Sequence, residues 1–321
     1  MDIETLQERA NIIKKIRNFF DSKNYLSVDT PLLSSDLIPE SCLEVFETER
    51  LFPHGSKEKS KPLWLIPSPE IHMKKIIAQH KTNVYQICKC FRNGESVGHL
   101  HNSEFTMLEY YTMNAGYMES LSLTEDLFKI FEKTRCTGRE TSAASAPFNR
   151  ITVADAFEKF AGFDLFTAAE QPGEMEKQAR RLGLEPASGL EVPVLYDLIF
   201  IHAVEPHLKT ERPIALLDYP AFVPCLAKKA QDGKTVERWE LYWNGIELAN
   251  CFSEETDPQN VKEFFTSEQE KRSKTALVQH SIDTDYWKIF EDFPKCSGVA
   301  MGLDRLIMAL LGKGDIGGVL I

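Results

Sequence analysis

Apolar and polar residues alternate with a period of two along residues 84–92 and again along residues 104–111. This period is typical of β-strands, because successive side chains point to opposite faces of the sheet. Two glycines and two histidines between the runs predict a turn-rich loop, and the pattern as a whole predicts a hairpin with Arg92 at its tip. One face of the second strand would carry Phe105, Met107, Glu109 and Tyr111.

A second hairpin is predicted in residues 236–252, where two alternating apolar runs flank Asn244-Gly245. Asn-Gly favours a two-residue type I′ turn. With that turn Glu240 opposes Ala249, and Glu247 is its diagonal neighbour on the same face, about 7 to 8 Å away at the backbone. Two carboxylates at that distance can converge on one Mg²⁺. Two solvated glutamates on an exposed face fit the same pattern.

Helical spacing predicts an amphipathic helix over residues 5–20, begun by a Thr5–Glu8 capping box. A short strand that stops at Pro31 follows it. Further predicted elements are a strand at 63–67, helices from Pro69, over 118–133 and from Thr152, and a mostly helical insert at 164–212.

The last pattern is a strand followed by a helix over residues 296–312. Gly298, Ala300 and Gly302 place small residues on one strand face, which leaves room for a ligand against the backbone. Arg305 falls in the first turn of the helix, where the helix dipole also favours a phosphate. A buried structural arginine is the alternative.

Composition narrows the class of protein. The chain has 321 residues, 43% of them hydrophobic, which is enough for a substantial core. No apolar run is long enough to span a bilayer, and the polar, acidic N-terminus does not fit a signal peptide. A net charge of −11 disfavours a protein that grips nucleic acid mainly through its phosphates. Seven cysteines without a CxxC pair suggest reduced thiols, so we expect a cytoplasmic protein without a membrane partner.

Three of these segments resemble known motifs. FRNGE at 91–95 with HNSEFTMLEYY at 101–111 resembles motif 2 of class II aminoacyl-tRNA synthetases, in the form of the lysyl enzymes. The first helix with the strand ending at Pro31 resembles motif 1, and residues 296–312 resemble motif 3. The RxGE form of motif 2 and Ala300 most resemble the free-standing lysyl-tRNA synthetase paralogues that ligate (R)-β-lysine to a lysine of elongation factor P.

This resemblance implies a fold and an activity. We expect residues 1–321 to form a single class II catalytic domain with an α+β fold, a mainly antiparallel sheet flanked by helices, that assembles as a homodimer through motif 1. Because the motif 1 helix begins at Thr5, we expect no anticodon-binding domain. The implied reaction uses ATP and Mg²⁺ to activate (R)-β-lysine or lysine as an adenylate, which elongation factor P then accepts.

The resemblance also implies residue roles. Arg92 and Arg305 would be catalytic, because they clamp the phosphates of ATP. ATP would bind through Arg92, Asn93, Gly94, Glu95, Asn102, Phe105, Glu247, Leu248, Gly302 and Arg305. The lysine-type substrate would contact Ser68, Pro69, Glu70, Glu109, Tyr111, Asn250, Glu254 and Ala300. Glu240 and Glu247 would hold Mg²⁺.

Some features depart from the family, and alternatives stay open. Cys251 stands where the NGFSE pattern of the lysyl enzymes has glycine, and a cysteine side chain pushed toward the substrate would narrow the site. A minimal lysyl-tRNA synthetase is one alternative, although the net negative charge makes tRNA an unlikely partner. A class II enzyme that makes an amide from aspartate and ammonia, or a non-catalytic paralogue, are the others.

Overall fold

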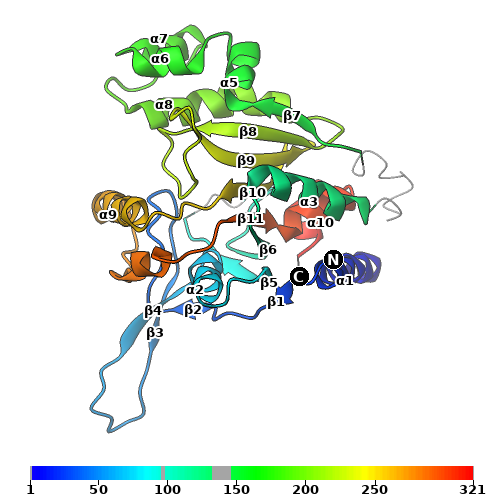
Figure 1. The fold of residues 1–321 in the computed structure, drawn as a ribbon, viewed down its shortest axis with the longest axis vertical. Coiled ribbons are helices and arrows are strands. Elements are labelled where there is room, and N and C mark those ends of the chain that lie inside the picture. Colours follow the sequence, from blue (N-terminus) through cyan, green and yellow to red (C-terminus); the bar gives the residue numbers. More distant parts are fainter. Residues whose placement is uncertain (1, 95–97, 132–145, 321) are drawn as a thin grey trace. The chain divides into compact units, whose positions relative to one another are not determined.

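The computed structural model describes residues 2–94, 98–131 and 146–320 of the chain (Figure 1). Its contacts divide the protein into two compact units, Met1–Ala115 with Glu255–Ile321, and Gly116–Glu254. Both units combine strands with helices, as an α+β fold requires. In the described parts of the chain, no helix is long and apolar enough to cross a membrane.

The first unit contains four strands of its main sheet in the order β1-β5-β6-β11 (Figure 1). They are β1 (Leu26–Ser27), β5 (Val84–Phe91), β6 (Glu104–Met113) and β11 (Cys296–Gly302). β1 pairs parallel with β5, and the other two pairings are antiparallel. A small second sheet has the order β2-β4-β3, from β2 (Leu33–Ser34), β3 (Glu47–Arg50) and β4 (Lys61–Leu65).

The helices of the first unit include the one predicted over residues 5–20. They are α1 (Ile3–Ser22), α2 (Glu70–His80), α9 (Pro258–Thr275) and α10 (Leu303–Leu310). The predicted Thr5–Glu8 capping box is wrong, because α1 begins at Ile3 and is capped by Asp2, whose carboxylate accepts from the Thr5 N–H at 2.7 Å. The strand expected over residues 25–31 is reduced to the two residues of β1.

The second unit contains four strands in the order β10-β9-β8-β7. They are β7 (Asn149–Thr152), β8 (Ile214–Pro220), β9 (Thr235–Trp243) and β10 (Ile246–Ser253). The helices are α3 (Tyr117–Lys129), α5 (Val153–Ala156), α6 (Leu165–Glu170), α7 (Glu174–Arg181) and α8 (Val192–Ile199), with π-helical turns at Phe157–Ala161 and Phe200–Val204. The mostly helical character predicted for residues 164–212 is confirmed.

The β9–β10 hairpin confirms the predicted turn and corrects the predicted register. Asn244 and Gly245 both have positive φ, 53° and 79°, as a type I′ turn requires. The pairing then shifts between Glu247 and Ala249, so Glu240 lies opposite Asn250 and not opposite Ala249. Such a bulge depends on how the strand packs, and the alternating pattern alone carries no sign of it.

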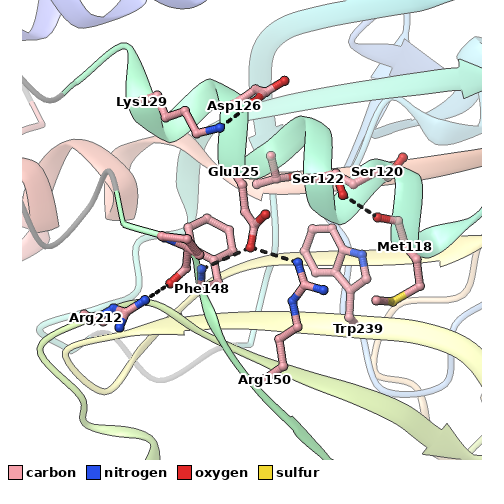
Figure 2. A network of polar contacts seen from close by, with 12 residues as sticks. Met118, Ser120, Ser122, Glu125, Asp126, Lys129, Phe148, Arg150, Arg212 and Trp239 are labelled. Atoms are coloured by element: carbon pink, nitrogen blue, oxygen red, sulfur yellow. Dashed lines mark hydrogen bonds and ion pairs between the residues drawn. The ribbon is translucent and has the colours of Figure 1, made fainter.

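Polar contacts around α3 fix the orientation of β9 (Figure 2). The Glu125 carboxylate accepts from the Phe148 N–H and from Arg150, each at 3.0 Å, and so joins α3 to the start of β7. The indole N–H of Trp239 donates to the Tyr117 carbonyl at 2.6 Å. Because Trp239 faces α3, its neighbours Arg238 and Glu240 point to the other face of the sheet.

Candidate active site

The strand register of the first unit gathers the predicted ligand-binding side chains on one sheet face. Glu109 of β6 lies opposite Gln86 of β5 on one side and opposite Ala300 of β11 on the other. Side chains of directly opposed residues share a face. The same face therefore carries Phe105, Glu109 and Tyr111 from β6, Cys88 and Cys90 from β5, and Gly298, Ala300 and Gly302 from β11.

Glu109 is a buried carboxylate with spare bonding capacity. Its side chain is 2% exposed, and the Tyr111 hydroxyl donates to Oε1 at 2.7 Å. Oε2 is buried and has no hydrogen-bond partner among the described residues. Burial raises the pKa of Glu109 well above its usual range, and the neighbouring charge of Glu70 raises it further. A cation that reached Oε2 would relieve both effects.

Glu70 stands in the first turn of α2, directly after Ser68 and Pro69. Pro69 is the capping residue and not the first helical residue that the sequence suggested. Glu70 Oε1 accepts from the fully buried ammonium of Lys74 at 2.6 Å, one helical turn away. This internal ion pair holds the Glu70 carboxylate in one orientation.

A third carboxylate, Glu40, belongs to this group and was missed from the sequence. Its pKa is raised to about 7 by burial and then by Glu70, against the opposing effects of Arg92 and Lys74. Glu40 lies outside regular secondary structure, in a turn that Arg272 of α9 anchors through the Glu40 carbonyl at 2.8 Å. No periodicity marks such a residue, so no sequence signal pointed to it.

The tip of the β5–β6 hairpin places Arg92 beside the ring of Phe105. The guanidinium carbon lies 5.3 Å from the ring centroid, and the Arg92 N–H donates to the Ser103 carbonyl at 3.0 Å. Gly94 has a φ of +70°, and a Cβ there would come within 3.2 Å of Glu44. Asn102 donates to the Glu104 carbonyl at 2.7 Å, which shapes the loop. Glu95 lies outside the described residues.

Hydrogen bonds at the start of α10 hold Arg305 and its neighbour Asp304 in place. The Arg305 Nε–H donates to the Leu100 carbonyl of the hairpin loop at 3.1 Å. Its neighbour Asp304 is 1% exposed, accepts from the Thr106 N–H at 2.5 Å and pairs with Arg9 of α1 at 2.6 Å. Sequence reasoning assigned Asp304 no role, yet its contacts fix the first turn of α10 and thereby the position of Arg305.

The second unit carries a separate polar group on β9 and β10. Glu240 accepts from Arg238 at 2.6 Å through Oε1 and from the Tyr242 hydroxyl at 2.9 Å through Oε2. Arg238 also donates through Nε to Asn250 Oδ1 at 3.0 Å. Glu247 lies opposite Tyr242 and is half-buried. Arg238, Glu240, Tyr242, Glu247 and Asn250 therefore share the face that points away from Trp239.

Three further predicted residues lie on β10 or at its end. Leu248, the bulge residue, is 1% exposed, and Glu254 is 2% exposed. Cys251 is buried and lies opposite Trp239, so its side chain is on the other face from Asn250. Strand alternation therefore turns the Cys251 side chain away from the face that carries Asn250. Burial, together with the charge of Glu254, raises the pKa of its thiol.

The predicted metal ligands are the carboxylates Glu240 of β9 and Glu247 of β10. Among the residues that the structure describes, no group of three or more His, Cys, Asp or Glu side chains is arranged to hold a metal ion. Mg²⁺ in nucleotide sites needs only one or two protein carboxylates, because phosphates and water complete its shell. Glu247 fits that requirement. Glu240 accepts one hydrogen bond on each oxygen, from Arg238 and from Tyr242, and keeps a second lone pair on each, so it fits that requirement as well.

Comparison with known proteins identifies the family of this chain. Residues 3–321 match the family model of class II tRNA synthetases (D, K and N). The chain is 37% identical over 320 residues to the elongation factor P–(R)-beta-lysine ligase of Histophilus somni (strain 2336), covering 99% of this chain and 94% of the relative. The ligase of the same name from Pasteurella multocida (strain Pm70) is 35% identical over 316 residues, covering 98% and 93%.

These matches extend over nearly the whole chain, and they confirm the α+β class II fold expected from the motifs. A third ligase of the same name, from Haemophilus influenzae (strain PittGG), is 35% identical over 312 residues, covering 97% of this chain and 92% of the relative. The chain belongs to the class II tRNA synthetase family, within its group of elongation factor P–(R)-beta-lysine ligases.

Proposed function

We propose that this chain is an ATP-dependent ligase that activates (R)-β-lysine or lysine as an adenylate and transfers it to a lysine side chain of elongation factor P. The observation that carries the proposal is Glu109, a buried carboxylate whose Oε2 is open among the described residues, on the face where motif 2 predicts substrate binding. The relatives named for this activity support the choice of substrate and acceptor.

The substrate is a diammonium acid, and the proposed contacts follow from its charges. Glu109 Oε2 would accept from one ammonium group, while Glu70, Tyr111 and Glu254 would hold the other. The negative charges of Glu109, Glu70 and Glu40 are opposed by the ammonium of Lys74 and by the guanidinium of Arg92. A buried carboxylate that lacks a cation is costly, so this group favours a positively charged substrate.

ATP would bind as the second substrate. Phe105 would stack on adenine, and Arg92 and Arg305 would bind the phosphates as planar, fixed guanidinium groups. The substrate carboxylate then attacks the α-phosphorus and pyrophosphate leaves. Arg92 stabilises the charge that builds on the α-phosphate, without a protein nucleophile. The amine of the acceptor lysine, once deprotonated, attacks the carbonyl carbon of the adenylate, and AMP leaves.

Mg²⁺ would supply charge neutralisation on the phosphates, and Glu240 and Glu247 are the residues of this chain that would hold it. Asn93, Gly94 and Asn102 would shape the loop around the nucleotide, and Gly302 would leave room for it beside Arg305. Ser68 and Ala300 would border the amino acid. A translation-related activity also implies a cytoplasmic location, which stays part of the proposal.

ATP–pyrophosphate exchange tests the activation step. We expect exchange that depends on Mg²⁺ and on lysine or (R)-β-lysine, and a loss of at least 1,000-fold in Arg305→Ala, because a transition-state phosphate contact is removed. The matched control is Arg180→Ala, which removes an exposed arginine of α7 that pairs with Glu176 and donates to the Pro186 carbonyl. Wild-type exchange without any lysine-type substrate, or full exchange in Arg305→Ala, would contradict the proposal.

The acceptor is tested in a single reaction that contains both candidates. Radiolabelled lysine or β-lysine is incubated with ATP, elongation factor P and bulk tRNA, and label is measured in each. We expect label in the protein, since a chain with a net charge of −11 is a poor ligand for tRNA phosphates. Label found chiefly in tRNA would favour a minimal lysyl-tRNA synthetase instead.

We also propose that the chain forms a homodimer through its N-terminal region. Exposed apolar side chains gather on α1 and the segment after it, and this surface exceeds what a solvated helix needs. They are Ile3, Leu6, Leu26, Leu32 and Leu33. Sedimentation at micromolar concentration should give a dimer, and Leu26→Glu should weaken it. A wild-type monomer under these conditions would count against this part of the proposal.

A further inference from the structure

Two cysteines of the first unit lie next to each other on the sheet face that carries Glu109. Cys88 and Cys90 are two residues apart on β5, so strand alternation points both thiols to the same face. Their sulfur atoms are 3.9 Å apart, in hydrogen-bond contact. Cys90 is 0% exposed, whereas Cys88 is half-buried. The pair is therefore a dithiol with one partly exposed and one buried member.

This dithiol is a close neighbour of the proposed substrate carboxylate. Cys88 lies opposite Met107 and Glu109 lies opposite Gln86, so Cys88 and Glu109 are diagonal neighbours, about 7 to 8 Å apart at the backbone. Their charges interact: after burial and the charge of Glu70, a negative charge on Cys88 also raises the pKa of Glu109. A bulky group attached to the Cys88 sulfur would therefore lie on the same face, within reach of Glu109.

The two thiols differ in protonation. Their hydrogen bond lowers the pKa of Cys88, because the Cys90 S–H group stabilises a thiolate on Cys88. The same hydrogen bond, and then burial, raises the pKa of Cys90 well above its usual range. Since the thiolate is the nucleophilic form of cysteine, Cys88 is the sulfur that reacts first, and Cys90 supplies the second sulfur.

The spacing of the pair decides which ligand it suits. Residues two apart on a strand are about 6.4 to 6.8 Å apart at Cα, the upper limit of the range of about 4.4 to 6.8 Å for a disulfide. β5 cannot bend to bring them closer, because it pairs with β6 from Val84 to Phe91. A large, soft atom between the two sulfurs removes the need for a direct bond, and thiolates prefer soft partners.

The ligand must also be satisfied with two sulfur atoms. Among the residues that the structure describes, no third His, Cys, Asp or Glu completes a metal-binding group with this pair. A trivalent organoarsenical meets this condition, because arsenic forms three bonds and its own organic group takes one of them. It therefore needs two thiols from the protein.

We propose that Cys88 and Cys90 form a dithiol site for trivalent organoarsenicals, and that the bridged adduct blocks lysine binding at Glu109. With phenylarsine oxide, two S–H bonds and the arsenic–oxygen bonding break, and two arsenic–sulfur bonds form. The two protons leave with the oxygen as water, and no atom changes its oxidation state. The blocking of lysine rests on the proposed function, whereas the dithiol site does not.

The first experiment measures the adduct itself, in the full-length protein with phenylarsine oxide as the probe. Intact-protein mass spectrometry after treatment with excess 2-mercaptoethanol counts the retained phenylarsenic groups, because a monothiol competes poorly with a two-sulfur chelate. We expect one retained group in the wild type, released by the dithiol dimercaptopropanol. The matched control Cys42→Ser removes an exposed cysteine and should retain it equally. Cys88→Ser and Cys90→Ser should each retain at least tenfold less.

The outcome for these variants decides whether the dithiol exists. Unchanged retention in folded Cys88→Ser and Cys90→Ser, or no retention in the wild type, would overturn the site. Circular dichroism and melting establish that each variant is folded. If a hydroxyl at the buried position 90 unfolds the protein, Cys90→Ala takes its place, because it removes the sulfur without burying a polar group.

The second experiment measures lysine binding by calorimetry before and after the adduct forms. We expect the adduct to weaken lysine binding at least 100-fold, and saturating lysine to slow adduct formation at least tenfold. Cys88→Ser, treated identically, should change less than twofold from its own untreated affinity. Full lysine affinity in the complete adduct would overturn the blocking. An untreated wild type that binds no lysine-type ligand would overturn the proposed function and the blocking together, while the retained adduct still decides the dithiol site.

Discussion

Glu109 is a buried glutamate of β6 and Glu240 a largely shielded glutamate of β9, and the sequence assigned both to ligand binding. Their surroundings differ. Glu240 has a partner on each oxygen and an arginine 2.6 Å away. Glu109 has a hydroxyl on one oxygen, no described partner on the other, and a pKa raised by burial. We expect a buried oxygen without a described partner, as in Glu109, to gain more from a cationic ligand than oxygens that already accept hydrogen bonds, as in Glu240.

The difference has a physical basis in the cost of burying charge. A paired buried carboxylate stabilises its partner, and its removal leaves that partner uncompensated. An incompletely paired one contributes little to the folded state and gains its full interaction only when a cation arrives. We therefore expect the two positions to respond to substitution in opposite ways.

The largest expected effect is on stability, in Glu240→Ala. This change leaves the buried Arg238 without its counter-ion, so the free energy of unfolding should fall by about 3 kcal/mol. Urea denaturation measures it. The matched control is Glu237→Ala on the same strand, where a more exposed pair with Lys228 at 3.0 Å should contribute less than about 1 kcal/mol. Equal losses in the two variants would contradict the comparison.

Glu109→Gln should affect ligand binding much more than stability. The substitution keeps the shape and removes the charge, so stability at pH 8 should change by less than about 1 kcal/mol, while lysine affinity falls roughly 100-fold through the lost charged hydrogen bond. Calorimetry and urea denaturation measure the two quantities. Glu104→Gln, on the same strand and paired at the surface with Lys89, is the control and should leave lysine binding unchanged.

A smaller effect is expected on the pH dependence of stability. Glu40 has its pKa raised to about 7 in the folded protein, from 4.5 for a free glutamate. Between those values the folded state binds more protons than the unfolded state, so stability is lost as pH rises from about 4.5 to 7. Glu40→Gln should reduce that loss, measured as the urea midpoint at pH 5 and pH 8. An unchanged slope in this variant would show that Glu40 is not responsible.

The smallest effect is expected from removal of one hydroxyl in each region. Tyr242→Phe and Tyr111→Phe each delete a donor to a buried carboxylate, and each should lower stability by about 1 kcal/mol. Only Tyr111→Phe should also raise the pKa of Glu109, because the Tyr111 hydroxyl opposes the effect of burial. Lysine binding by that variant should then need a higher pH, whereas a matching pH shift in Tyr242→Phe would contradict the comparison.

Local patterns predicted which way many side chains point. The Asn244-Gly245 turn, the face that Phe105, Glu109 and Tyr111 share, and the helix that follows Thr152 are all confirmed. Each depends on a few neighbouring residues, because turn chemistry and strand alternation are properties of the local backbone. The family and its class II fold were likewise recognisable from three short motifs.

Only the tertiary structure determined which side-chain and backbone atoms are in contact. The bulge near Leu248 places Asn250 opposite Glu240. Asp2, and not Thr5, caps α1. Glu40, which lies in a segment without any periodic pattern, interacts with the charge of Glu70. A sequence pattern shows that a glutamate is buried, but whether its oxygens are already bonded depends on residues brought together by packing. The sequence by itself therefore determined the fold and the candidate residues. Only the tertiary contacts distinguished Glu109, whose Oε2 has no partner among the described residues, from Glu240, whose two oxygens each accept a hydrogen bond.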